Sequence, residues 1–147
     1  MRTLLVAALF VVSLPAAADK PRLPPNATYK AECGSCHVAY PPKLLPAGSW
    51  EQLMQRLDRH FGSDASLDAK AQEEISRYLA AHASRREPPP GAEPRITETR
   101  WFRKEHDKEV PAALWRSAAV KSAANCGACH TRAEDGDYSE RSLRLPK

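Results

Sequence analysis

Large apolar side chains are scarce in this chain. Its 147 residues include only three phenylalanines, three tryptophans and two methionines, against 13 prolines. The mean hydropathy of −0.55 is marginal for a chain that must fold by hydrophobic burial alone. Short domains of this kind usually add disulfides, a metal ion or a cofactor to a thin side-chain core. The composition therefore predicts that something besides apolar side chains completes the core.

Long apolar runs are absent outside the first 18 residues. Met1-Arg2 is a basic start, residues 4–14 are apolar, and Ala16-Ala17-Ala18 is an A-x-A cleavage site. This pattern is typical of a secretory signal peptide and is too short for a membrane span. Cleavage would remove 18 of the 147 residues, leaving 129 from Asp19 onward. We expect an exported chain with no membrane span, located in the periplasm of a bacterial host.

Strong charge of one sign is missing as well. The formal charge of +4 falls to +3 when Arg2 is removed with the signal peptide. A dense stripe of lysine and arginine with interleaved aromatic residues, which nucleic-acid-binding proteins commonly show, is not present. We therefore expect no nucleic-acid partner.

Helical periodicity predicts three helices. Ser49 and Gln52 form a capping box at the start of the first, and Gly62 ends it. The second runs from about residue 68 to 82, with apolar residues along one stripe. Pro111 suits the first turn of the third. No segment has the pattern of a strand, so the sequence predicts an all-α fold without a sheet.

The mature chain, residues 19–147, divides into two helical lobes. The first lobe covers about residues 27–84 and the second about residues 96–147. Between them lies a proline-rich spacer, about residues 85–95, whose three consecutive prolines favour a stiff, extended backbone. The second lobe opens with a charged and aromatic segment, up to Val110, that has no clear periodicity.

Each lobe contains one copy of the pattern C-x-x-C-H. The first is Cys33-Gly34-Ser35-Cys36-His37 and the second is Cys126-Gly127-Ala128-Cys129-His130. This is the attachment pattern of c-type haem. Two cysteines three residues apart lie about one helical turn from each other and can reach both vinyl groups of one porphyrin. The histidine that follows is then placed to bind the iron.

Two other interpretations of the cysteines are weaker. A thioredoxin-like redox pair needs a strand-helix-strand context, and this chain has no predicted strand. A zinc site built from all four cysteines would not require a histidine after each pair. We therefore expect two covalent haem c groups, which would also complete the thin core. Their four propionates would take the formal charge of +3 to about −1.

The second axial ligand of each iron is less determined. Beyond His37 and His130 the chain has three histidines: His60, His82 and His106. Met54 is the single methionine outside the signal peptide, and its apolar helix face favours a core position. Two methionine-ligated haems are therefore excluded, whereas two bis-histidine haems are possible with one histidine to spare. His106 lies in a charged segment, and periodicity does not separate His60 from His82.

The sequence resembles the small exported dihaem cytochromes c of the DHC type over most of the mature chain. The resemblance rests on segments in both lobes: residues 32–37, 39–42, 44–46, 49–50, 60–62, 95–99, 101–102, 122–126 and 136–138. It implies low-spin bis-histidine haems and an electron-transfer role. By position it implies that His60 and His106 are the distal ligands and that His82 is not one. The usual partners in that family are a small oxygen-binding monohaem cytochrome c and a membrane cytochrome b.

We therefore predict a periplasmic electron carrier, not an enzyme, with two low-potential haems and partly exposed haem edges. Cys33, Cys36, Cys126 and Cys129 would attach the haems. Local reach pairs His37 with His60 and His130 with His106, although a compact core also permits a swapped pairing. The alternative is a haem enzyme or gas sensor in which one iron keeps an open or labile site.

Overall fold

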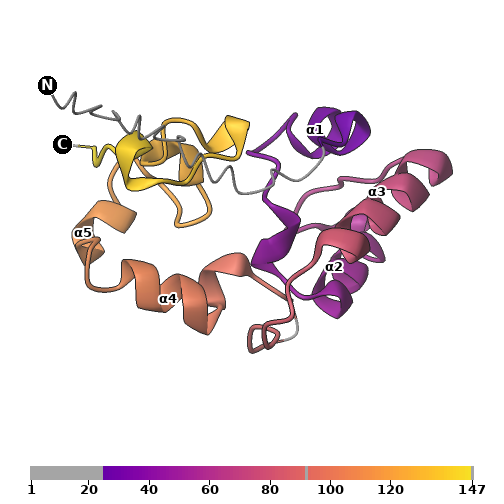
Figure 1. Ribbon diagram of the computed structural model, residues 1–147, viewed down its shortest axis with the longest axis horizontal. Coiled ribbons are helices and arrows are strands. Elements are labelled where there is room, and N and C mark those ends of the chain that lie inside the picture. Colours follow the sequence, from indigo (N-terminus) through magenta and orange to yellow (C-terminus); the bar gives the residue numbers. More distant parts are fainter. Residues whose placement is uncertain (1–24, 92, 147) are drawn as a thin grey trace, which may run out of the picture.

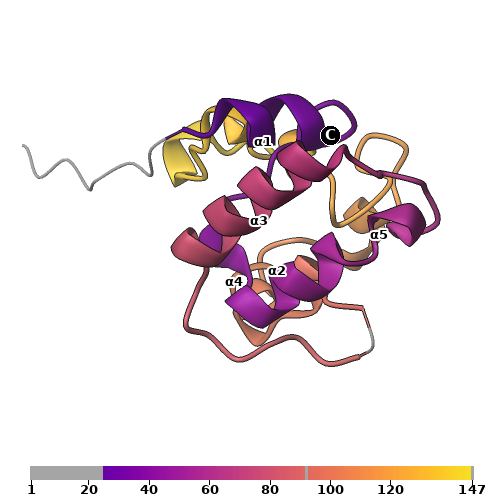
Figure 2. The same cartoon turned by 90° about the vertical axis from the view of Figure 1, so that its right-hand side faces the viewer.

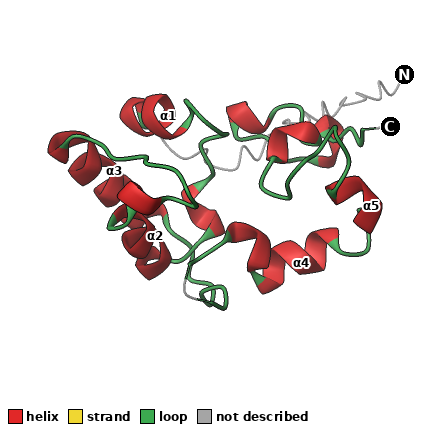
Figure 3. Cartoon of the chain, turned by 180° about the vertical axis from the view of Figure 1, so that it is seen from behind, coloured by secondary structure: helices red, strands yellow, loops and turns green. Residues whose placement is uncertain are grey.

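The computed structural model describes residues 25–91 and 93–146, so the predicted signal peptide lies outside the described residues. Within those two ranges the chain is helical and contains no strand, as predicted (Figure 3). Single β-bridges join a few separate positions, among them His130 and Leu143. No helix in the described part is long and apolar enough to cross a membrane.

The described helices form two groups (Figure 1). The first group lies on one side of the molecule and the second, with the C-terminal turns, on the other. The α-helices are α1 (Ala27–Cys33), α2 (Ala47–Met54), α3 (Ala69–His82), α4 (Arg100–His106) and α5 (Ala112–Trp115). Short 3-10 turns join them: η1 (Pro42–Leu44), η2 (Leu57–Arg59), η3 (Ile96–Glu98), η4 (Cys126–Ala128), η5 (Ala133–Asp135) and η6 (Glu140–Ser142).

The main hydrophobic core lies between α1, α2 and α3, which pack together as Figure 2 shows. Its buried members are Tyr29, Leu45, Trp50, Met54, Ile75 and Leu79. Met54 is only 5% exposed. It therefore occupies the core position that its apolar helix face predicted.

Helix α3 is confirmed by the structure almost residue for residue. Asp68 is its N-cap, and the Asp68 carboxylate accepts hydrogen bonds from the backbone N–H groups of Lys70 and Ala71. Ile75 and Leu79 on its apolar stripe are fully buried. The match is good because a strong cap and a regular apolar stripe both point to the same bounds.

The prediction for the first helix is wrong at both ends. Helix α2 begins at Ala47, with Pro46 as N-cap, so Ser49 lies inside the helix and is buried. The Pro46 carbonyl accepts from the N–H groups of Ser49 and Trp50, and no side chain caps the helix. The helix ends at Met54, and η2 replaces the predicted last turns. The helix therefore starts two residues before Ser49, directly after an extended proline.

Helix α4 was not predicted from the periodicity of its segment. Thr99 caps it, since the Thr99 hydroxyl accepts from the Phe102 N–H at 3.1 Å. The helix is short and largely exposed, with Phe102 as its buried side chain. Helix α1 was also missed; the Asn26 side chain caps it by accepting from the Tyr29 N–H at 2.6 Å. The predicted helix at Pro111 is present as the short α5.

The proline-rich spacer runs along both groups of helices rather than standing free. The Arg86 guanidinium lies over the Trp101 ring, 4.9 Å from its centroid, and also donates to the Lys43 carbonyl at 3.3 Å. Pro89 and Pro94 are buried. The spacer therefore links α4 to the residues that precede α2.

Candidate functional site

The first C-x-x-C-H motif begins in the last residue of α1. Cys33 is half-buried there, and Cys36 is exposed in the turn that follows. The His37 Nδ1 lies 2.7 Å from the Val38 carbonyl oxygen, a distance at which a protonated Nδ1 donates a hydrogen bond. That bond leaves Nε2 without a proton and available as a metal ligand.

His60 faces His37 from the other side of the first lobe. The two ring centroids are 6.2 Å apart and the ring planes differ by 25°. His60 follows η2, and Phe61 after it has a φ of 50°, in the left-handed region. The Phe61 ring packs edge-on against His60 at 4.8 Å and lies under the Arg95 guanidinium at 4.2 Å. A strained turn and these contacts hold the His60 ring in place.

A second pair of histidines has the same spacing. His106 ends α4 and His130 follows η4, and their ring centroids are also 6.2 Å apart, with an angle of 73° between the planes. The His106 Nδ1 lies 2.8 Å from the Phe102 carbonyl, and its ring stacks on Phe102 at 4.0 Å. As in His37, the hydrogen bond leaves Nε2 free to bind a metal ion.

The spacing of both pairs fits two imidazoles that share one metal ion. An imidazole nitrogen binds a metal ion at about 2.0–2.1 Å. The ring centre lies about 1.1 Å beyond that nitrogen, given ring bonds of about 1.33 Å. Two imidazoles on opposite sides of one ion therefore have centroids about 6.3 Å apart. The structure gives 6.2 Å for each pair.

Electrostatics favours the neutral imidazoles that metal binding requires. Burial, and then the neighbouring His37, lower the pKa of His60, while Glu93 opposes the change. Burial, and then His106, lower the pKa of His130, against the opposing effect of Asp137. The lowered pKa of each ring favours the neutral imidazole, which has a lone pair for a metal ion.

The second C-x-x-C-H motif occupies η4 and the residues just after it. Cys126 opens the turn and is half-buried, whereas Cys129 is buried. Burial raises the pKa of the Cys126 thiol to about 11. Burial, followed by the Cys126 thiol, raises the pKa of Tyr40 to about 12 and also raises that of Tyr138. Tyr40 and Tyr138 therefore both lie close to Cys126.

The cysteines do not form a zinc site. No disulfide joins any two of the four cysteines, and burial, followed by Glu32, raises the pKa of the Cys33 thiol to about 11. In the described residues no group of three or more His, Cys, Asp or Glu side chains is arranged to hold a metal ion. Each motif instead lies beside one pair of facing histidines, as a haem site requires.

The polar atoms left unpartnered also fit haem groups. In the described part of the chain, four buried side-chain atoms lack a hydrogen-bond partner: His60 Nδ1, His130 Nδ1, Tyr138 Oη and Ser139 Oγ. The Tyr138 ring lies 5.2 Å from the His130 ring. Buried polar groups are nearly always satisfied, and three of these four belong to the histidine pairs or to Tyr138 beside His130. A haem propionate beside the second pair would give the Tyr138 hydroxyl an acceptor that the chain itself does not supply.

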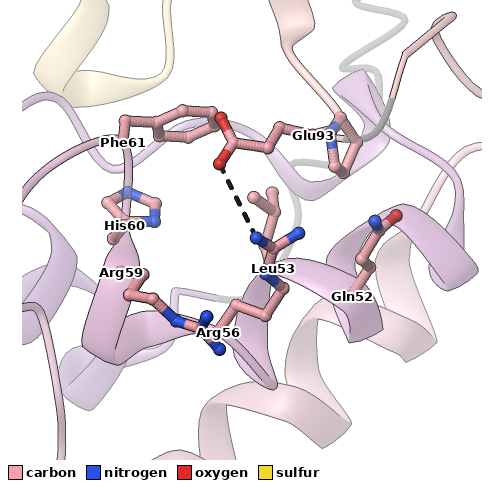
Figure 4. Close-up of a pocket in the computed structure, with 8 residues that line it drawn as sticks. Gln52, Leu53, Arg56, Arg59, His60, Phe61 and Glu93 are labelled. Carbon is pink, nitrogen blue, oxygen red and sulfur yellow. Dashed lines mark ion pairs between the residues drawn. The ribbon is translucent and has the colours of Figure 1, made fainter.

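A pocket opens beside His60 (Figure 4). Arg56, Arg59 and Glu93 line it with His60 and Phe61, and Arg56 pairs with Glu93 at 4.0 Å. The two guanidinium groups suit a carboxylate, which arginine binds well through its planar fork. The pocket therefore adjoins the first histidine pair, because His60 lines it.

His82 belongs to neither histidine pair. Its ring packs against Tyr78 of the same helix, with centroids 5.0 Å apart. Among the described residues, ring contacts join His37 to His60 and His106 to His130, and none joins His82 to another histidine. The positions implied by the family resemblance are thus brought together, and the spare histidine is not.

Some residues that shape the sites were not singled out from the sequence. Thr99 starts the helix that ends in His106, and Phe102 supplies both the stacked ring and the carbonyl beneath His106. The spacing of Thr99 to Phe102 and of Phe102 to His106 is helical, and this was the available signal. Tyr40, stacked on His37, had no local pattern to mark it.

Comparison with known proteins agrees with this geometry. The dihaem cytochrome c family model matches residues 29–138. A diheme cytochrome c from Shewanella baltica is similar at 39% identity and a TM-score of 0.72, covering 82% of this chain and 93% of its own. One from Rhodobacter sphaeroides is similar at 41% identity and a TM-score of 0.70, covering 80% of this chain and 100% of its own. No curated protein sequence matches.

The paired motifs and the fold, which is helical over residues 25–91 and 93–146, define a c-type cytochrome. The chain belongs to the dihaem cytochrome c family, and it carries two covalently bound haem c groups, with which its two C-x-x-C-H motifs agree. Membership of this family supports an electron-transfer role.

Proposed function

We propose that this cytochrome transfers electrons through two low-spin haems, each held by two histidines. His37 and His60 are the axial ligands of the first haem, and His130 and His106 those of the second. The observation that carries the proposal is the repeated spacing of 6.2 Å between facing imidazole rings, once in each lobe. Two unrelated backbone settings produce this one distance.

The haem supplies reversible one-electron chemistry at its iron. The two facing histidines of each pair would hold that iron between them. Backbone carbonyls of Val38 and Phe102 hold His37 and His106 in the tautomer that exposes Nε2. Because histidine occupies both axial positions in either oxidation state, the surrounding side chains need little rearrangement on reduction.

Histidine at both positions also implies low reduction potentials. A methionine ligand would raise the potential, but Met54 is buried in the core between α2 and α3. Potentiometric titration should therefore give two potentials below those of ordinary His/Met cytochromes c. A potential in the His/Met range would contradict this ligation.

The location and partners follow from the sequence rather than from the site. An exported chain with this pattern of residues 1–18 would act in the periplasm. Its partners would be other redox proteins, and by family resemblance these are a small oxygen-binding monohaem cytochrome c and a membrane cytochrome b. The chain would carry electrons between such proteins rather than transform a substrate.

Three single substitutions test the ligand assignment. His60→Ala and His106→Ala should each convert one of the two haems to a high-spin form that binds one carbon monoxide per protein. His82→Ala is the matched control, because this histidine lies outside both pairs, and it should leave both haems low-spin. Each variant is first checked for two attached haems by its pyridine haemochrome.

The same series separates the carrier from a haem enzyme or gas sensor. Rapid, stoichiometric binding of carbon monoxide by the unmodified reduced protein would favour an open or labile site. If His82→Ala opened a site while His106→Ala did not, the assignment of the second distal ligand would be wrong.

A further inference from the structure

The two C-x-x-C-H motifs meet at the segment that directly follows the first one. A methyl group placed on Gly127 would lie 3.8 Å from the Val38 side chain. The Tyr40 hydroxyl donates a hydrogen bond of 2.7 Å to the Ala124 carbonyl, 84 residues away in the sequence. In Figures 1 and 2 the C-terminal turns accordingly lie next to the segment that leaves α1.

Tyr40 contacts both histidine-containing sites with different parts of its side chain. Its ring stacks on the His37 ring, with centroids 4.6 Å apart and planes within 14°. Its hydroxyl reaches the backbone two residues before Cys126. Stacking restricts rotation of the His37 ring, and the hydrogen bond ties that stacked pair to the second motif.

Tyr40 is itself held in place. The buried Tyr29 side chain donates a hydrogen bond of 2.6 Å from its hydroxyl to the Tyr40 carbonyl. Tyr29 belongs to α1 and to the main hydrophobic core. The backbone of Tyr40 is thereby anchored to the hydrophobic core of the first lobe, which restrains the position of its side chain.

We propose that Tyr40 is a positioning residue shared by both haem sites: its ring sets the plane of His37, and its hydroxyl fixes the approach of the second motif. This inference rests on the proposed role of His37 as an axial ligand. It also gives the chain a short connection from one iron ligand to the cysteine attachment of the other haem, through Ala124 and Asn125 to Cys126. A change at either end is transmitted through one side chain.

Two substitutions at Tyr40 separate the two contacts. Tyr40→Phe keeps the ring and removes the hydroxyl, whereas Tyr40→Leu removes both. Tyr78→Phe is the matched control, because it also removes a tyrosine hydroxyl. The ring of Tyr78, on α3, contacts Tyr29 and His82 but neither histidine pair. EPR of the oxidised protein and the two reduction potentials are measured for each variant.

The signals are assigned with the ligand variants, since His60→Ala removes the low-spin signal of the first haem and His106→Ala that of the second. Tyr40→Phe should shift the EPR signal and the potential of the second haem and leave those of the first unchanged. Tyr40→Leu should shift both haems. Tyr78→Phe should shift neither.

The inference would be overturned if Tyr40→Leu had the wild-type EPR signals and reduction potentials for both haems. It would also be overturned if Tyr78→Phe shifted them as much as the Tyr40 variants do. If Tyr40→Leu does not incorporate two haems, Tyr40→Phe decides alone, through the presence or absence of the shift in the second haem. A high-spin first haem in the unmodified protein would instead overturn the ligand assignment of the proposed function. A low-spin wild type with an unchanged second haem in Tyr40→Phe would overturn only the role of the hydroxyl as a link.

Discussion

The two glycines that occupy the same place in the two motifs should respond differently to the same substitution. Gly34 and Gly127 both follow the first cysteine of C-x-x-C-H. Gly34 caps α1, where its N–H donates to the Lys30 carbonyl at 3.1 Å. Its φ is −70°, which any residue adopts, so the requirement at this position is one of space and not of backbone conformation.

The space around the two positions differs sharply. A Cβ at Gly34 would overlap the carbonyl oxygen of Lys30 and lie 3.3 Å from its carbonyl carbon. That neighbour is backbone in the last turn of α1 and cannot rotate away. A Cβ at Gly127 would meet the Val38 side chain at 3.8 Å and the Asn125 side chain at 4.0 Å, which are ordinary van der Waals contacts.

We therefore expect Gly34→Ala to destabilise the protein by about 1–3 kcal/mol, the usual range for forcing extra atoms into a packed place. Gly127→Ala should stay within about 0.5 kcal/mol of the wild type, or stabilise it slightly by restricting the unfolded chain. Because Cys33 ends α1 and binds the first haem by its motif position, Gly34→Ala should also disturb the spectrum of that haem.

Urea denaturation of the haem-containing proteins, followed by circular dichroism and haem absorbance, measures this difference. A pyridine haemochrome first establishes that both variants contain two haems. The reasoning would be refuted by a Gly127→Ala variant that is as unstable as Gly34→Ala, or by a Gly34→Ala variant with wild-type stability.

Three further predictions concern the core, pH and a helix cap. Leu79→Ala should cost about 2–5 kcal/mol in urea denaturation because Leu79 is 1% exposed, whereas Leu145→Ala, at 46% exposed, should change stability by less than about 0.5 kcal/mol. Burial lowers the pKa of His60 and His130 in the folded protein, so the unfolded chain takes up protons first as the pH falls through about 6.5. The free energy of unfolding should therefore decrease from about pH 7.5 to about pH 5.5. A free energy of unfolding that stays constant or rises over this range would contradict the prediction. Thr99→Ala removes the cap of α4 and should cost about 1 kcal/mol in the same assay, with Thr99→Ser restoring most of it.

The sequence predicted those parts of the fold for which local signals agree. Helix α3 has a capping aspartate, Asp68, and a regular apolar stripe, and the structure confirms its bounds within one residue. The absence of strands in the described residues and the presence of two covalent haems were also predicted. In both cases the spacing of residues in the sequence is enough for the prediction. The helical fold follows from the periodicity of apolar residues, and the haem attachment follows from the spacing of two cysteines and a histidine.

The parts that were missed depend on contacts between distant residues. Helix α4 has one buried side chain, Phe102, so its periodicity is weak, and the local signals were the cap at Thr99 and the helical spacing of Phe102 and His106. The apparent capping box at Ser49 was misleading because Ser49 is buried within α2 and Pro46 starts the helix instead. The contact from Tyr40 to Ala124 spans 84 residues, and no local pattern encodes it.

The pairing of histidines falls between these two cases. With three histidines for two open positions, one more than needed, periodicity alone left His60, His82 and His106 unresolved. In the structure, His82 faces Tyr78 on its own helix while His60 and His106 each face a motif histidine. Family resemblance indicated this arrangement where residue patterns did not, because a ligand position is a property of the tertiary fold.

The two lobes differ in how much side-chain core they contain. We therefore expect the second lobe to depend on its haem for folding more than the first lobe does. The first lobe has a packed side-chain core between α1, α2 and α3. The second has α4 with seven residues, α5 with four, and 3-10 turns of three residues each. Helices of that length are not stable by themselves, so we expect the covalently attached haem of this lobe to supply much of the apolar surface on which they would pack. We therefore expect folding of this lobe to depend on its haem, whereas the hydrogen bond from Tyr40 to Ala124 ties the folded lobe to the first one.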